Sequence, residues 1–199
     1  MKNRLLCLTL SLVLCLTMML STGLAVNLPF IDNHDIDMVH EKAVSECVDR
    51  KILNGYPDGT FNPRGEITRA EMCKILCVAM TGKENAPAPT TLRDPSFIDI
   101  WGHWAEGYIE FCYAKDIVAG MGNDSFAPSN PITGMQALKM VLIGLCGKNG
   151  NDYLGSHWLV NVNANALLCG LYDDLDDVDM NEPMTREHIA QMIWNALDS

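Results

Sequence analysis

Basic residues are scarce in this chain. Its 199 residues contain 14 Lys and Arg against 25 Asp and Glu, which gives a formal net charge of −11 at pH 7. A protein that binds phosphates along a nucleic acid or a lipid surface needs an excess of cations. The deficit therefore argues against general binding to nucleic acid or to an anionic membrane surface.

Long apolar runs are missing after Ala25. Near the N-terminus, the basic residues Lys2 and Arg4 precede an apolar run over residues 5–20, and the small residues Gly23 and Ala25 follow it. This order predicts a secretory signal peptide over residues 1–25, with an uncleaved membrane anchor as the alternative. Cleavage removes both basic residues and makes the net charge still more negative. We expect a secreted protein at the cell wall or cell surface, without stable membrane insertion after cleavage.

Catalytic and metal-binding constellations are also missing. No nucleophile, base and orienting residue recur together and no phosphate-binding loop occurs, so we expect no enzymatic activity, no cofactor and no metal. Cys73 and Cys77 lie one helical turn apart, but no histidine or second close pair completes a four-ligand set.

The cysteines after Ala25 are even in number, so an exported chain could form three disulfides. Four of them lie among apolar residues of expected helices, which favours free buried thiols over a disulfide framework. The six residues are Cys47, Cys73, Cys77, Cys112, Cys146 and Cys169.

The most informative stretch runs from Asn54 to Met80. Its first part is rich in Gly, Pro and Asp and predicts an ordered loop. Thr68 and Glu71 have the i, i+3 spacing that predicts a capping box at a helix start. Apolar residues then recur at the spacing of one buried helical face, namely Met72, Ile75, Leu76, Ala79 and Met80.

This unit is repeated along the chain. When Gly120 is aligned with Gly55, the turn, loop and cap residues of a second copy fall on those of the first. The second capping box is formed by Thr133 and Gln136. The other pairs in this register are Cys112 with Cys47, Phe126 with Phe61, Pro128 with Pro63 and Ile132 with Ile67.

A third, degenerate copy occupies residues 148–199. His157 and Trp158 correspond to His103 and Trp104 of the second copy. The loop of this third copy, residues 173–182, is acidic and has lost its glycines. Alternating carboxylates suit calcium, but the glycine of an EF-hand loop is missing, so a solvated acidic loop is the first interpretation.

The repeats predict an all-α fold of three helix-loop-helix units packed around a pseudo-threefold axis, because a lone helix pair cannot bury both apolar faces. We divide the chain into a signal peptide over residues 1–25, repeat 1 over 26–82, repeat 2 with a Pro-rich linker over 83–147, and repeat 3 over 148–199.

Together these residues resemble the S-layer homology repeat. The resemblance rests on Phe97-Ile98-Asp99 with Trp104, on the loop ending in Phe126-Ala127-Pro128, and on the run Ile67-Thr68-Arg69-Ala70-Glu71. Three such repeats in tandem are similar to one complete S-layer homology domain and cover nearly all of the mature chain.

The resemblance implies non-covalent attachment to the bacterial cell wall through secondary cell-wall polysaccharide, often pyruvylated, bound in grooves between repeats. The family pattern implies that Arg69, Arg186, Asp99, Trp104 and Trp158 line those grooves. The chain departs from the pattern where Val39 replaces the Trp of copy one and Gly134 replaces the Arg of copy two. Few grooves are therefore expected to be complete.

The positions of Arg69 and Arg186 also suggest chemistry by themselves. Both are expected at the first position of a helix, where the macrodipole disfavours a cation. Free amides of the first turn and a guanidinium together would form a site for a carboxylate. The alternatives are a salt bridge for each arginine, a core position for each tryptophan, and surface or capping positions for His40, His103 and His157.

These observations favour a wall-polysaccharide-binding module. The alternative is a structural or adaptor module whose degenerate repeats bind another exported protein.

Overall fold

The computed structural model describes residues 28–85 and 94–198, and this part of the chain is all-α, as predicted. The predicted signal peptide and the middle of the Pro-rich linker lie outside the described residues. The helices are the short 3-10 helix η1 (Asn33–Asp35), α2 (Glu41–Asp49), α3 (Arg69–Thr81), α4 (Glu106–Tyr113), α5 (Gly134–Gly144), the 3-10 helix η2 (Gly150–Tyr153), α6 (Trp158–Leu168) and α7 (Arg186–Asp198).

Both predicted capping boxes are present. The Thr68 hydroxyl accepts from the Glu71 amide at 3.2 Å, and the Glu71 carboxylate accepts from the Thr68 amide at 2.8 Å. Thr133 and Gln136 make the same reciprocal pair at the start of α5. These bonds satisfy amides that have no partner within the helix, which fixes where α3 and α5 begin.

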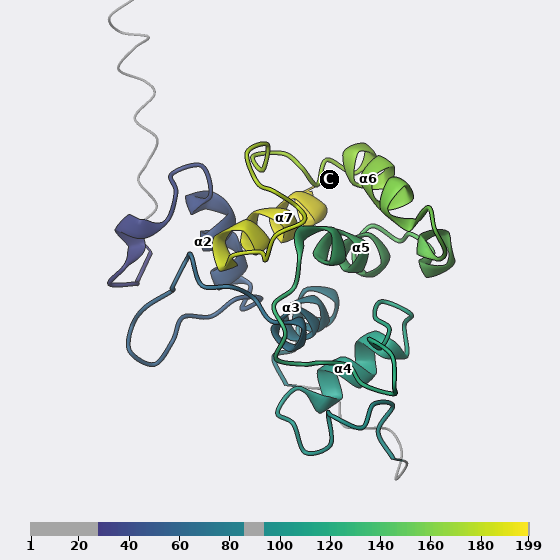
Figure 1. Ribbon diagram of the computed structural model, residues 1–199. Helices are drawn as coiled ribbons and strands as arrows, with labels where there is room; N and C mark the ends of the chain where they lie inside the picture. The colour runs from purple at the N-terminus through teal and green to yellow at the C-terminus, as the bar shows by residue number, and fades with distance from the viewer. Residues whose placement is uncertain (1–27, 86–93, 199) are drawn as a thin grey trace, which may run out of the picture.

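The first helix of each repeat packs on the second helix of the preceding repeat. Helix α4 packs on α3, α6 packs on α5, and α2, from the first repeat, packs on α7 at the end of the chain. The second helices also contact one another, α3 with α5 and α5 with α7 (Figure 1). Repeat 1 therefore contacts repeat 3 through elements far apart in the sequence.

Three backbone hydrogen bonds close a ring among the repeats. The Ile67 amide donates to the Met184 carbonyl, the Met184 amide to the Ile132 carbonyl, and the Ile132 amide to the Ile67 carbonyl, each at 2.9 Å. The three residues stand at equivalent places, just before the N-cap positions of α3, α5 and α7. This cyclic pattern supports the pseudo-threefold arrangement, which stays a prediction.

The core consists of the apolar faces of these helices and of the residues that precede them. Ile67, Phe61, Phe126, Ile132 and Met184 are fully buried. The six described cysteines are free thiols. Cys47, Cys73, Cys77 and Cys112 are buried as expected of small apolar side chains, whereas Cys146 and Cys169 are half-buried.

Among the described helices, none combines the length and the apolar character needed to cross a membrane. His40, expected at the surface or at a capping position, is the N-cap residue of α2, but it is only 4% exposed and its side chain makes no cap hydrogen bond. Helix α2 packs on α7, and the His40 ring contacts the ring of His188 in α7.

Candidate functional site

Asp99 holds the loop of repeat 2 in shape. Its carboxylate accepts from the Phe126 amide at 2.8 Å, from the Ala127 amide at 2.7 Å and from the Ser125 hydroxyl at 2.6 Å. Ala127 has a positive φ of 59°, an unfavourable conformation for a residue with a Cβ. The Asp99 carboxylate thus stabilises a strained turn, and the hydrogen bonds that it accepts come from residues of the loop.

Asp32 does the same in repeat 1, which the sequence analysis missed. Its carboxylate accepts from the Phe61 amide at 2.8 Å and from the Asn62 amide at 2.7 Å. The signal was the triplet Phe30-Ile31-Asp32, which has the same sequence pattern as Phe97-Ile98-Asp99. The register that pairs Gly120 with Gly55 concealed the match, because the segment before α2 is slightly longer than its counterpart before α4.

The loop of repeat 2 in turn holds Arg69 of repeat 1. The Arg69 Nε donates to the Phe126 carbonyl at 2.9 Å, and Nη2 donates to the Ala119 carbonyl at 3.0 Å. The guanidinium carbon lies 4.4 Å from the centre of the Phe126 ring. Burial lowers the pKa of Arg69, with Cys73 and Asp99 opposing the shift, yet an arginine stays charged at neutral pH.

Arg186 occupies the equivalent position between repeats 3 and 1. Its Nε donates to the Phe61 carbonyl at 2.8 Å, its Nη2 donates to the Asn54 carbonyl at 2.7 Å, and its guanidinium lies over the Phe61 ring. Among the described residues neither arginine forms a salt bridge. These contacts therefore do not support the alternative that each arginine forms a salt bridge.

The expectation of free amides beside the arginines is wrong. The Arg69 amide donates to the Asn130 carbonyl and the Ala70 amide to the Pro128 carbonyl. In α7, the amides of Arg186 and Glu187 likewise donate to loop carbonyls of repeat 1. The carbonyls of a neighbouring repeat satisfy these first-turn donors, so the N–H groups left for a ligand are those of the guanidinium.

One cavity of about 250 Å³ lies beside Arg69, between repeats 2 and 3. Lys139 of α5 and Trp158 of α6 line it, and the Lys139 ammonium lies 6.0 Å from the centre of the Trp158 ring. Burial lowers the pKa of Lys139. We call this cavity the Arg69 groove. It is lined by Arg69, Ile117, Val118, Ala119, Gly120, Met121, Gln136, Lys139, Met140, Tyr153, Leu154, Gly155 and Trp158.

Tyr153 contributes a further polar group to the Arg69 groove. The residue is 1% exposed, and its hydroxyl has no hydrogen-bond partner in the described part of the chain. A buried hydroxyl without a partner costs free energy, so its retention calls for an explanation. Burial, with help from Asp152 and the two nearby thiols, raises the pKa of Tyr153 to about 12, so the hydroxyl remains protonated.

The residues at equivalent places around the ring differ in charge. Gln136, the last capping-box residue of α5, is neutral and lines the Arg69 groove. Its counterpart Glu71 is a carboxylate near enough to Arg186 to oppose the lowering of the Arg186 pKa that burial causes. The first residue of the helix also differs: it is Arg69 in α3 and Arg186 in α7, but Gly134 in α5. Of the two arginines, Arg69 is thus the one that combines a second cation with a neutral neighbour.

The five sequence-predicted site residues are not brought to one place. Arg69 and Trp158 line the same groove. Asp99 acts indirectly, because it accepts a hydrogen bond from the amide of Phe126, whose carbonyl binds Arg69. Arg186 lies against repeat 1, and Trp104 is 57% exposed beside Tyr108. Their roles in ligand binding stay predictions. Lys139 and Tyr153 were missed, although the alignment of the first two copies pairs Lys139 with Lys74.

Replacing Asp99 by Asn should remove part of the stability that depends on pH. Burial alone would raise the pKa of Asp99, but the hydrogen bonds from Phe126, Ser125 and Ala127 outweigh it and hold the pKa below its usual value. A carboxyl with a lowered folded-state pKa stabilises the protein above the unfolded-state pKa, and this contribution is lost as the pH falls toward the folded-state value. Urea unfolding at pH 7 should show Asp99→Asn to be less stable than wild type, with the difference shrinking at pH 3 and below.

The control for this experiment is Asp124→Asn, which changes the same charge in the same loop without removing those hydrogen bonds. It should follow the wild-type pH dependence. A pH-independent gap between wild type and Asp99→Asn would show that the carboxylate does not act through its lowered pKa.

Comparison with known proteins agrees with this architecture. The family model of the S-layer homology domain matches residues 34–73 and 96–138. The chain is 31% identical over 104 residues to cell surface glycoprotein 1 of Acetivibrio thermocellus, covering 50% of this chain and 4% of that protein. It is 32% identical over 103 residues to the cellulosome-anchoring protein of the same organism, covering 50% of this chain and 22% of that protein.

An uncharacterized cell wall amidase of Bacillus anthracis is 35% identical over 83 residues, covering 42% of this chain and 15% of that protein. The chain thus spans less than a quarter of the length of each of these relatives. These relatives include surface and anchoring proteins as well as an enzyme, and they support a location at the cell surface. Residues 34–73 and 96–138 thus match the family of S-layer homology domains, at two of the three predicted repeats.

Proposed function

We propose that this chain attaches non-covalently to the bacterial cell wall by binding an acidic secondary cell-wall polysaccharide in the Arg69 groove. A pyruvylated sugar is the ligand we expect. The observation that carries the proposal is the meeting of Arg69, Lys139 and Trp158 around one cavity between repeats. The module itself has no catalytic role in this proposal.

The groove offers complementary chemistry for such a ligand. A guanidinium carries five N–H donors, and two of those of Arg69 are used by the Phe126 and Ala119 carbonyls. The remaining donors and the Lys139 ammonium can bind a carboxylate on the sugar. The Trp158 ring provides a flat apolar face for the sugar ring. The Tyr153 hydroxyl, which has no partner in the described part of the chain, would gain a hydrogen bond to the ligand if the residues lining the groove moved slightly.

The overall charge of the protein opposes this binding. The formal net charge is −11, so an acidic polymer is repelled at long range and attracted only near the two cations of the groove. The attraction at close range is less screened by salt than that between exposed charges. The apparent affinity should therefore change only modestly with salt, through two opposing effects.

Binding to purified sacculi tests the proposal. We expect the protein to sediment with sacculi that carry the polysaccharide, and to remain in the supernatant after the polysaccharide has been removed chemically. Lys139→Gln should weaken sedimentation, because it removes a cation from the groove. Lys74→Gln, at the equivalent place on α3, is the matched control. Undiminished retention on stripped sacculi would contradict polysaccharide binding.

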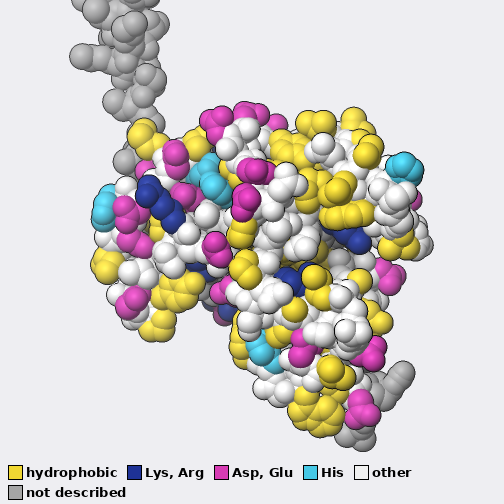
Figure 2. Space-filling model, viewed as in Figure 1, with side chains coloured by type: hydrophobic (Ala, Val, Ile, Leu, Met, Phe, Trp, Pro, Cys, Tyr) yellow, Lys and Arg dark blue, Asp and Glu magenta, His cyan; other side chains and the backbone are white. Residues whose placement is uncertain are grey.

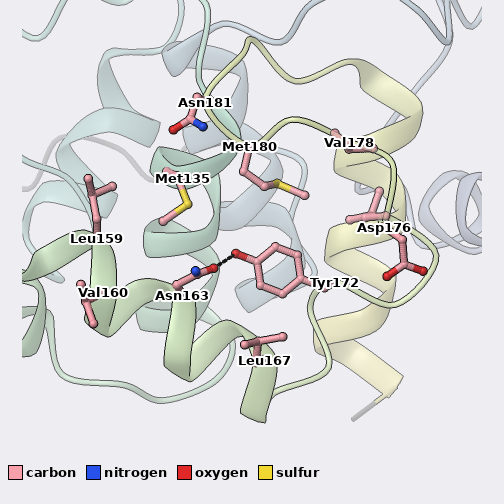
Figure 3. A pocket seen from close by; sticks show the side chains of 11 residues that line it. Met135, Leu159, Val160, Asn163, Leu167, Tyr172, Asp176, Val178, Met180 and Asn181 are labelled. Carbon is pink, nitrogen blue, oxygen red and sulfur yellow. Dashed lines mark hydrogen bonds between the residues drawn. The ribbon is translucent and has the colours of Figure 1, made fainter.

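A second candidate function is an adaptor that binds another exported protein, and one surface favours it. Helix α6 contains no charged residue, and Val160, Leu167 and Leu168 are 66%, 65% and 81% exposed. Beside it, a cavity of about 570 Å³ is lined by apolar side chains of α6 and the loop before α7, with Tyr172 donating a hydrogen bond to Asn163 (Figure 3). Retention by the wall that ignores the polysaccharide would support this function.

A further inference from the structure

A second inter-repeat cavity has the opposite charge to the Arg69 groove. It measures about 510 Å³ and lies between the loop that precedes α7 and the segment that precedes α2. Acidic side chains gather over that loop, next to a histidine (Figure 2). We call this cavity the acidic groove. Its carboxylates belong to Asp37, Asp174, Asp176, Asp177, Asp179 and Glu182.

The acidic groove occupies the place around the ring that follows the Arg69 groove. The Arg69 groove is lined by the loop and α5 of repeat 2 together with the start of repeat 3, and the acidic groove by the loop and the start of α7 of repeat 3 together with the start of repeat 1. The backbone hydrogen bonds between the repeats are also equivalent. The Met135 amide of α5 donates to the Met180 carbonyl, as the Ala70 amide of α3 donates to the Pro128 carbonyl. In this place the arginine is replaced by Gly134, whose Cβ would lie 2.7 Å from the Met180 Cα. Of the described residues, no lysine or arginine lines the acidic groove.

His40 is an independent sign that the acidic groove binds something. It lines the cavity, it is 4% exposed, and within the described part of the chain its buried Nδ1 has no hydrogen-bond partner. The ring of His188 meets it edge to face at 5.4 Å and also lines the cavity. A buried ring nitrogen without a partner is costly, and a ligand that donates hydrogen bonds would supply one.

A metal ion fits the acidic groove less well than an organic cation. Among the described residues, no group of three or more His, Cys, Asp or Glu side chains lies close enough together to hold a metal ion. The carboxylates are spread around a cavity of about 510 Å³, which suits a molecule that carries its own donors. An ammonium group has three donors for carboxylates and for a neutral imidazole.

We propose that the acidic groove binds a primary ammonium group of a cell-wall component. The site is separate from the Arg69 groove, and only the choice of cell-wall amines rests on the proposed function. Two wall components carry this group, an amino sugar without its acetyl group and the side chain of a diamino acid in a wall peptide. The chain would then bind the cell wall through two sites of opposite charge.

Calorimetric titration of the whole protein with four probes tests the inference. The probes are a glucosamine trimer, its N-acetylated form, a lysine-containing tripeptide and its Nε-acetylated form. We expect at least one of the two amines to bind, at least tenfold more tightly than its acetylated form, and to bind more weakly as salt is added, because the carboxylates are exposed. The preferred amine identifies the source.

Variants assign the binding to the acidic groove. The double variant Asp176→Asn with Asp177→Asn should weaken amine binding about tenfold, and His40→Phe should weaken it while leaving the thermal unfolding midpoint close to wild type. The control is Asp49→Asn with Asp198→Asn, which makes the same change in net charge at exposed positions outside the groove. It should change binding less than twofold.

Three results would overturn the inference. One is equal binding of the amines and their acetylated forms, and another is an equal effect of the two double variants. The third is calcium chloride alone giving a saturable heat that EGTA reverses and that excludes the amines, since the site would then be a metal site. Sacculus binding through Arg69 should persist in Asp176→Asn with Asp177→Asn, so failure here is distinguishable from failure of the proposed function.

Discussion

Arg69→Ala should lower the affinity for polysaccharide-bearing sacculi by about tenfold to a hundredfold. Hydrogen bonds to charged groups contribute about 1.5–3 kcal/mol each, and about 1.4 kcal/mol corresponds to a factor of ten in affinity. The variant removes the guanidinium from a groove in which Lys139 is the remaining cation. Sedimentation with sacculi over a range of protein concentrations measures the change.

Arg186→Ala is the matched control for this loss. Both arginines donate to two loop carbonyls of a neighbouring repeat and lie over a phenylalanine ring, so both variants remove equivalent structural contacts. Arg186 also has the carboxylate of Glu71 nearby, which weakens attraction for an acidic ligand. We expect Arg186→Ala to reduce sacculus binding less than Arg69→Ala, at a similar loss of thermal stability. Equal effects of both variants would show that binding does not depend on the Arg69 groove alone, and no effect of either would contradict the proposed mechanism.

Gly134→Ala should destabilise the protein by about 1–3 kcal/mol, the usual cost of overpacking a close contact. The added Cβ would lie 2.6 Å from the Met180 Sδ and 2.7 Å from the Met180 Cα. The sulfur can move, but the Cα cannot without shifting the loop that accepts from the α5 amides. Chemical denaturation measures the change, and Gly134→Arg, which restores the residue of the family pattern, should be at least as unstable.

Gly144→Ala provides the comparison within the same helix. Its Cβ would lie 3.4 Å or more from Met80, Ile117 and Leu76, which is ordinary contact. An alanine is favoured over glycine in a helix by up to about 1 kcal/mol. We therefore expect Gly144→Ala to be neutral or slightly stabilising. If both glycines tolerated alanine equally, close approach of Met180 would not explain the lost arginine.

Features whose interacting residues lie close together in the sequence were predicted correctly. Thr68 with Glu71 and Thr133 with Gln136 predict capping boxes, since both partners lie within one turn, and both boxes are present. The Gly, Pro and Asp residues after Asn54 predict an ordered loop, and Phe61 in this loop is fully buried. The role of Asp32 was missed only because a short insertion before α2 moves it out of the register that aligns the two loops.

Signals that depend on distant partners were read less well. A helix start alone suggests free amides, but those beside Arg69 and Arg186 are bonded to carbonyls of a neighbouring repeat. The acidic loop before α7 was interpreted as a solvated segment, and its carboxylates are exposed, but the sequence did not show what the loop faces. Its position against the segment before α2, at the other end of the described chain, makes it one wall of a cavity that contains His40.

The sequence by itself determined the all-α class, the helix starts and the repeating unit, because capping and helical periodicity act within a few residues. Only the tertiary structure decided which groups share a groove, because each groove is lined by residues from more than one repeat. That assembly brings Arg69 together with Lys139 and Trp158, and surrounds His40 with carboxylates. The charge of each groove is therefore a property of the packing, which no single repeat contains.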